Sequence, residues 1–416
     1  MKRNFVFTAV SVGSRLLVSA LLFVLLARAW GPEQFGTFAF VFSVAALLML
    51  IVDFGFPTFL LREVAADADH VSKLIAQGLQ AKLLLTAVMS AVAATLALVL
   101  GSHTLPTALF MLLLLSAYLL SYSEFCLAPL RALGRYDVET VLSMCGNTLQ
   151  FALAGGVVWL GGSPTSVAIA IVGSRSVYLL ACWLALARAA PMVSLRPERG
   201  GVRSTIQTLW PYGIDSALTS AWNFVDIIAV RVLFDAQVAG LYAAGQRCIQ
   251  GVVALAPIVG NVTIPGIARH AARQSGDTWR AAAHAGILMA GIGLAFAAPM
   301  IAFPGQMVGV VFGSEFSELS EWLPWFGAIL IARFSGAAFG VILTALGLQK
   351  KRIAGQIMAV GSYVVCIALV DILGGGMIAA LAALLLAMAI MGSSHAVQLY
   401  LAKRRNWIGI RQPMTE

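Results

Sequence analysis

The sequence predicts an all-α polytopic membrane protein of about 12 transmembrane helices in two six-helix lobes, and three observations support this fold class. First, 60% of the 416 residues are hydrophobic and only 11% are charged, whereas about a quarter of the residues of a soluble domain are charged. Second, long apolar segments recur along the chain, as they do in proteins that span bilayers. Third, motifs of the first half of the chain recur in the second half. A soluble protein of this size would lack the charged residues needed to cover its surface.

Twelve segments approach the length of about 20 apolar residues that is needed to cross the hydrocarbon core. They cover residues 5–27, 36–61, 77–100, 106–129, 138–160, 165–187, 207–230, 238–264, 281–303, 322–346, 353–372 and 376–402. The first segment begins like a signal peptide, after Lys2 and Arg3, but Arg15 interrupts it. At about 23 residues it also exceeds the apolar region of a signal peptide, which has about 7–15. We therefore expect an uncleaved first transmembrane helix.

The distribution of the 27 basic residues predicts the orientation of these helices. With the N-terminus in the cytoplasm, the outer connections contain only Arg28 and Arg231, whereas most other Lys and Arg residues fall in inner connections. The outer connection before the tenth segment contains Glu315, Glu318 and Glu321 and no base. Because cytoplasmic connections are enriched in Lys and Arg, we expect both termini in the cytoplasm. The same bias explains most of the formal charge of +9, so no nucleic-acid partner is expected.

Two pairs of motifs indicate an internal duplication. The stretch 28-RAWGPEQFGTFAF-40 is matched by 231-RVLFDAQVAGLYAA-244, and 129-PLRALGRYD-137 is matched by 342-ILTALGLQKKR-352. The matched glycines are 204 residues apart in the first pair and 213 apart in the second, a difference that a short insertion explains. Parallel repeats of this kind in transporters place the substrate site between the halves, near the membrane midplane. We expect an N-terminal six-helix lobe at 1–188, a cytoplasmic inter-lobe linker at 189–206, a C-terminal six-helix lobe at 207–403 and a cytoplasmic tail at 404–416.

Several short motifs follow one another in an order typical of one family. They are 31-GPEQFGTFA-39, 53-DFGFP-57, 61-LRE-63, ALGR at 132–135, 311-VFGSEF-316 and ALG at 345–347. Over essentially the whole chain, this order resembles the polysaccharide-transport (O-antigen or lipid-linked oligosaccharide) flippases of the multidrug/oligosaccharidyl-lipid/polysaccharide exporter superfamily. The resemblance implies a multi-pass protein of the bacterial inner membrane that exports a lipid-linked oligosaccharide by alternating access. It also implies contact with membrane lipids, and it makes a polysaccharide polymerase and other assembly proteins candidate partners.

Five basic residues fall inside the apolar segments, where each charge costs about 2.5–3.5 kcal/mol on insertion. They are Arg15, Lys82, Arg175, Arg247 and Arg333. The four arginines come from both halves and lie near one depth, so we expect the five bases to line a substrate cavity. Arginine binds phosphate through two hydrogen bonds and stays charged, which suits the pyrophosphate of a polyprenyl-linked oligosaccharide. The alternative is that each base has a structural partner, Arg15 with Asp53, and that Lys82 extends toward the inner water.

The seventh segment carries a polar face that suits a coupling ion. Asp215, Thr219, Asn223 and Asp226 recur there at helical spacing. Carboxylate, hydroxyl and amide oxygens suit protons or sodium ions, so we expect this face and Asp53 to serve ion coupling or charge pairing. An ion gradient would then drive export. The alternative is that Asp215 pairs with a cavity arginine and that Asp226 lies near the outer water.

Other classes of function are disfavoured. The chain has no phosphate-binding loop motif, and its five cysteines lack CxxC spacing, so we expect no metal and no cofactor other than a coupling proton or sodium ion. A multidrug cation antiporter of the same superfamily would need an acidic, aromatic cavity, whereas the intramembrane set is basic. A membrane enzyme that uses polyprenyl sugars would need carboxylates or His on a large outer loop. The segment 304–321 has Glu315 and Glu318 but no His, and we expect no enzyme.

Overall fold

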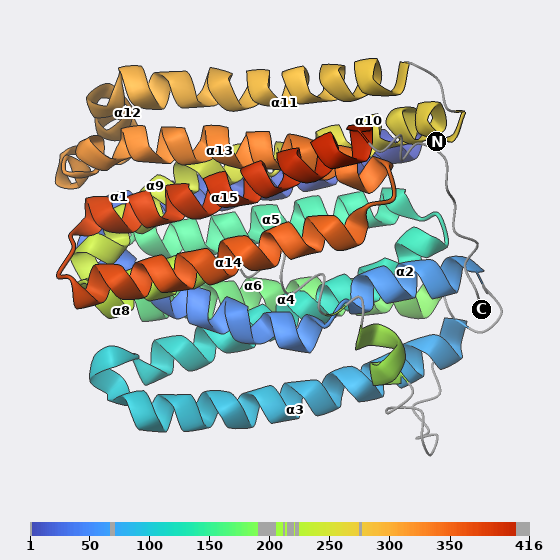
Figure 1. Cartoon of the computed structure of the whole chain (residues 1–416). Helices are drawn as coiled ribbons and strands as arrows, with labels where there is room; N and C mark the ends of the chain where they lie inside the picture. The colour runs from blue at the N-terminus through green and yellow to red at the C-terminus, as the bar shows by residue number, and fades with distance from the viewer. Residues whose placement is uncertain are drawn as a thin grey trace. The chain divides into compact units, whose positions relative to one another are not determined.

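The computed structural model describes residues 2–66, 71–189, 205–210, 213, 220, 224–273 and 277–404 of the chain. Within this part all regular structure is helical and no strand occurs (Figure 1). The predicted all-α class is therefore confirmed for the described residues.

The chain separates into two compact units, Met1–Gly240 and Leu241–Glu416. The helices of the first unit are α1 (Lys2–Asp53), α2 (Phe56–Ala66), α3 (Val71–Thr104), α4 (Thr107–Ala132), α5 (Tyr136–Trp159), α6 (Pro164–Ala189) and α8 (Val225–Leu233). Helix α9 (Ala236–Val253) begins in the first unit and continues into the second. The second unit adds α10 (Leu255–Ala272), α11 (Asp277–Ala302), α12 (Pro304–Val311), the short 3-10 helix η1 (Ser314–Phe316), α13 (Leu319–Ala345), α14 (Gln349–Ile372) and α15 (Met377–Arg404). The predicted linker at 189–206 falls almost wholly outside the described residues, so the lobe boundaries stay predictions.

Ten helical stretches of the described chain are long and apolar enough to cross a membrane. Ser11–Val64 covers the first two predicted segments, and the other nine stretches each correspond to one further segment. The remaining predicted segment, 207–230, is described only in part, with α8 at its C-terminal end. A polytopic membrane protein is therefore confirmed, whereas the count of twelve spans and the cytoplasmic termini stay predictions.

Glycines at positive φ interrupt the long helix α1 and its junction with α2. Gly31 has a φ of 67° and is followed by Pro32, so the first predicted helix ends where the sequence placed its turn. The second predicted segment, 36–61, is wrong as one continuous helix. Phe54 and Gly55 have φ values of 32° and 74° and separate α1 from α2, because positive φ interrupts helical hydrogen bonding.

The last three helices of each predicted lobe agree at a constant sequence offset. Helices α5 and α14 begin at Tyr136 and Gln349, and helices α6 and α15 begin at Pro164 and Met377. Both pairs are 213 residues apart. Gly134 and Gly347, which are also 213 residues apart, have φ values of 77° and 74° and end α4 and α13. In both turns the glycine N–H bonds the carbonyl three residues back, and the next N–H bonds the carbonyl five residues back, a Schellman ending. This agreement supports the predicted duplication.

The first pair of repeated motifs meets within the first unit. A Cβ atom at Gly36 would overlap the carbonyl oxygen of Ala236, and a Cβ atom at Gly240 would overlap the carbonyl oxygen of Pro32. The two contacts are reciprocal, because both partners are 204 residues apart. Reciprocal contact of this kind is what a two-fold axis between the motifs would produce. Only glycine fits at these two positions.

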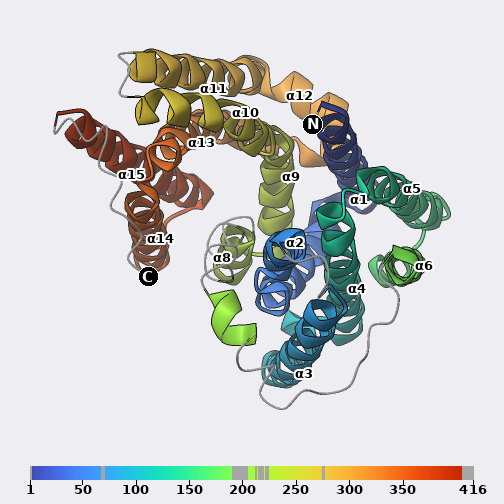
Figure 2. The same ribbon diagram turned by 90° about the vertical axis from the view of Figure 1, so that its right-hand side faces the viewer.

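Helix α13 is the central element of the second unit, where it packs against α10, α11, α14 and α15 (Figure 2). Gly293 of α11 permits a close approach, since a Cβ atom there would lie 2.8 Å from the Cβ atom of Phe334. His395 of α15 is 2% exposed. Its Nδ1 atom lies 3.3 Å from the Gly336 oxygen of α13, and its Nε2 atom lies 3.1 Å from the Arg352 oxygen of α14. This imidazole therefore links three helices.

Candidate functional site

Lys82 of α3 is bound at the break between α1 and α2. Its side chain is completely buried, with Nζ at 3.3 Å from the Asp53 carboxylate and at 2.6 Å from the Ser121 hydroxyl. The Ser121 hydroxyl in turn donates to Asp53 at 2.8 Å. Nζ also lies 3.4 Å from the Val52 carbonyl oxygen, which the end of α1 leaves without a helical donor. Lys82 therefore does not extend toward water, and it pairs with Asp53.

Arg15 has a different partner from the one that the alternative interpretation gave it. Its Nη1 atom lies 3.0 Å from Glu124 Oε1, between α1 and α4. Arg131 Nη2 lies 2.6 Å from the other oxygen of Glu124, and Arg131 Nε lies 2.9 Å from Glu139 Oε1 of α5. We call these four residues the ion-pair chain. The pairing of Arg15 with Asp53 was wrong, because the carboxylate nearest in space comes from another helix.

The sequence interpretation missed three members of the ion-pair chain. Glu124 was placed near a helix end, and Arg131 was counted only as an inner base. The available signal was spacing, because residues seven apart in a helix share one face. Glu139 follows Arg131 across the short turn between α4 and α5, where the two helices lie side by side.

Arg175 of α6 is buried among neutral partners. It is 9% exposed. Its Nε atom donates to Gln150 Oε1 of α5 at 3.2 Å, and its Nη1 atom donates to the Ser116 hydroxyl of α4 at 3.2 Å. No carboxylate of the described chain pairs with it. Its positive charge is therefore solvated by dipoles but is not neutralised.

The two bases of the second unit have few polar contacts. Arg333 of α13 is 9% exposed and makes no hydrogen bond or ion pair within the described part of the chain. Arg247 of α9 donates from Nη1 to Gln250 Oε1 at 2.9 Å. Because Arg15, Lys82 and Arg175 belong to the other unit, the convergence of the five bases stays a prediction.

The predicted coupling face is described at one of its four positions. Asp226 of α8 is fully buried, and its Oδ1 atom accepts from the Ile227 N–H at 2.8 Å. The alternative that placed Asp226 near outer water does not agree with this burial. Asp215, Thr219 and Asn223 lie outside the described residues, so the coupling role stays a prediction.

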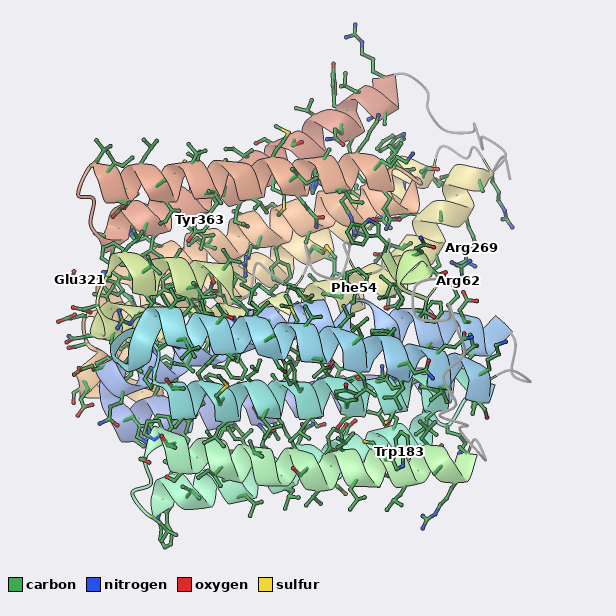
Figure 3. The ribbon with its side chains drawn as sticks, turned by 90° about the horizontal axis from the view of Figure 1, so that it is seen from below. Phe54, Arg62, Trp183, Arg269, Glu321 and Tyr363 are labelled. Atoms are coloured by element: carbon green, nitrogen blue, oxygen red, sulfur yellow. The ribbon has the colours of Figure 1, made fainter. Side chains whose placement is uncertain are left out.

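A cavity of about 340 Å³ opens between α3, α4 and α6 of the first unit. Its lining is almost entirely apolar and includes Leu79, Tyr122, Phe125 and Trp183; Figure 3 labels Trp183. None of the predicted cations lines this cavity. Among the described residues no group of His, Cys, Asp and Glu has a metal-binding arrangement.

Comparison with known proteins agrees with the resemblance. Residues 1–270 match the family described as "Polysaccharide biosynthesis protein". A protein of Escherichia coli (strain K12) named "Putative O-antigen transporter" is 34% identical over 73 residues, and this match spans only 18% of either protein.

Solved structures of one superfamily share the fold. An inward-facing "multidrug resistance MATE family transporter of the MOP superfamily" has a TM-score of 0.70 at 14% identity, with 97% of this chain and 98% of that chain covered. An outward-facing structure with the same family description has a TM-score of 0.61 at 15% identity, with 97% and 95% covered. These identities establish the fold alone. Because the family match covers more than half of the sequence and the fold agrees, the chain belongs to the polysaccharide biosynthesis protein family of membrane transporters in the MOP superfamily.

Proposed function

We propose that the protein is a flippase that moves a polyprenyl-pyrophosphate-linked oligosaccharide across the bacterial inner membrane by alternating access. Membership of the polysaccharide biosynthesis protein family supports a sugar-containing substrate. The observation that carries the proposal is buried positive charge without a carboxylate partner, at Arg175 in one unit and Arg333 in the other. A pyrophosphate would supply the missing negative charge.

The energetic argument separates these two arginines from Lys82. Removing a charge from water costs several kcal/mol even after relaxation of the protein, and Lys82 offsets this cost with Asp53. Arg175 has only amide and hydroxyl acceptors, which are weaker partners than an anion. A guanidinium in this condition is ready to bind phosphate oxygens without first breaking an ion pair. Arg175 and Arg333 are therefore the strongest candidates among the five predicted bases.

Two further features belong to the same proposal. A proton or sodium gradient would drive export through Asp53 or the face that carries Asp226, and a polysaccharide polymerase would receive the exported product. The family likeness to multidrug transporters raises the alternative of a cation antiporter, but buried unneutralised arginines would repel a cationic drug. An exporter of an anionic lipid is the better fit to these charges.

The proposal is tested by transport in proteoliposomes. The substrate is a fluorescent short-chain polyprenyl-pyrophosphate disaccharide, and its movement between leaflets is followed with a quencher outside the vesicles. Arg175→Gln and Arg333→Gln should each lower the transport rate by at least about tenfold, because a hydrogen bond to a charged group is worth about 1.5–3 kcal/mol. Arg188→Gln is the matched control for Arg175, since Arg188 is an exposed arginine of the same helix.

Two results would contradict the proposal. One is unchanged translocation in both buried-arginine variants, provided that they elute as folded monodisperse protein. The other is transport of organic cations, and not of the pyrophosphate lipid, by the unmodified protein. The conservative variant Arg175→Lys keeps the charge but loses the planar fork, so it should retain part of the activity that Arg175→Gln loses.

A further inference from the structure

One oxygen atom of a buried carboxylate in the first unit has no hydrogen-bond partner. Glu139 lies in the first turn of α5 and is 5% exposed. Its Oε1 atom accepts from Arg131 Nε at 2.9 Å, but its buried Oε2 atom has no partner within the described chain. A buried acceptor without a donor costs free energy, and a proton on that oxygen would relieve part of the cost.

The ion-pair chain connects this carboxylate to Arg15. Arg131 contacts Glu139 through Nε and Glu124 through Nη2, and Glu124 contacts Arg15 through its second oxygen at 3.0 Å. Two guanidinium groups and two carboxylates alternate from α5 through α4 to α1, so the chain is neutral when Glu139 is ionised. One bound proton gives the chain a net positive charge.

We infer that Glu139 is a proton-binding site and that its protonation frees Arg15 to bind an anion; this rests on the proposed function of the protein. A proton from water adds to Oε2 and forms one O–H bond, and no other bond forms or breaks. Arg131 then has Glu124 as its remaining carboxylate partner and attracts it more strongly. Glu124 correspondingly weakens its contact with Arg15, whose half-exposed side chain becomes available to a phosphate.

The surroundings of Glu139 favour a proton over a metal ion. A single free oxygen suits a proton, whereas a hard cation such as calcium takes 6–8 oxygen ligands, as a rule of thumb. Water lies close, because the turn before α5 is exposed at Gly134 and Arg135, about one helical turn from Glu139.

The charged and titratable groups near Glu139 come from four helices. On α5 itself Asp137 faces solvent and pairs with Arg135 at 3.7 Å. The helices packed against α5 are α1, α4 and α6. They contribute Arg15 from α1, Glu124 and Arg131 from α4, and Tyr178, Cys182 and the exposed Arg188 from the corresponding half of α6. Among these groups the carboxylate of Glu139 is the one with a buried oxygen that lacks a partner.

Linkage gives this arrangement a direction. If a proton on Glu139 strengthens anion binding at Arg15, then a bound anion must strengthen proton binding at Glu139 by the same factor. Anion affinity should therefore rise as the pH falls, by about tenfold or more between the two limits. The protein should also take up a proton when it binds a pyrophosphate lipid.

The experiment measures binding of farnesyl pyrophosphate to the full-length protein in lipid nanodiscs, from about pH 4 to 8. The wild type should bind more tightly at low pH and should take up protons from a weakly buffered solution that contains a pH-sensitive dye. Glu139→Gln resembles the protonated carboxyl, so it should bind tightly with little pH dependence beyond that of the ligand and should lose the uptake. Asp137→Asn is the control, because Asp137 is an exposed acid of the same helical turn, and it should behave as the wild type does.

The outcomes separate this inference from the proposed function. If the wild type binds farnesyl pyrophosphate at no pH, the proposed function fails, and this inference fails with it. If Glu139→Gln keeps the wild-type pH dependence and proton uptake, only the inference fails. Should Glu139→Gln not fold, Glu124→Gln takes its place. It removes the carboxylate that holds Arg15 and should likewise give tight binding with little pH dependence, and a wild-type profile would overturn the inference.

Discussion

At the scale of single residues, Lys82 shows how a buried cation is held in an apolar segment. It is fully buried and pairs with Asp53 at 3.3 Å. Removing one partner of a buried ion pair destabilises a protein by about 3–5 kcal/mol, because the other charge is left without a partner. Lys82→Met should therefore lower the unfolding midpoint strongly in detergent micelles, and the double variant Lys82→Met/Asp53→Asn should recover part of the loss.

Lys73→Met serves as the control for this prediction, since Lys73 is an exposed lysine of the same helix. It should change the midpoint little. A double variant that is no more stable than Lys82→Met would show that charge isolation is not the cause of the loss.

The residue scale also shows what the sequence could predict about the site. Hydropathy identified the intramembrane bases, because charge inside an apolar segment is conspicuous. The partners could not be found in the same way. Helical spacing gives the face and depth of Arg15, but the choice between Asp53 and Glu124 depends on which helix lies beside α1.

At the scale of helices, two glycines of α11 provide a matched pair of sites. A Cβ atom at Gly293 would lie 2.8 Å from the Cβ atom of Phe334, whereas a Cβ atom at Gly291 would meet nothing within 4 Å. Gly293→Ala should destabilise the protein by about 1–3 kcal/mol through overpacking against α13. Gly291→Ala should be neutral or stabilising by up to about 1 kcal/mol, since alanine is favoured in helices. Equal shifts of the thermal unfolding midpoint in the two variants would contradict a close contact between α11 and α13.

Helix ends were predictable where glycine or proline determines the backbone. Gly31 with Pro32 marks the first turn, and Gly134 and Gly347 end their helices as the repeated ALG motifs suggested. The break at Phe54 and Gly55 was not predicted, because transmembrane helices tolerate glycine and proline when neighbouring groups satisfy the backbone. Here Lys82 supplies that group by contacting the Val52 oxygen, and this contact is not visible in the sequence.

At the scale of the whole molecule, composition predicted the class and short motifs predicted the family. The low charged fraction required a membrane protein, and the order of weak motifs identified a family that the match over residues 1–270 confirms. The arrangement of the two lobes could not be derived in this way. It depends on contacts between helices far apart in sequence, and each of those helices is apolar on several faces.

The orientation of the molecule follows from its charge asymmetry and can be tested in the second unit. Glu321 and Arg269 lie at opposite ends of that unit (Figure 3), as expected if the acidic connection is outside and the basic one inside. We predict that Glu318→Cys reacts with a membrane-impermeant maleimide added to intact cells, whereas Arg280→Cys reacts only after permeabilisation. Both variants use a Cys145→Ala background, because Cys145 is the exposed native cysteine. Labelling of Arg280→Cys in intact cells, with Glu318→Cys protected, would reverse the orientation and place the buried arginines in a protein with outside termini.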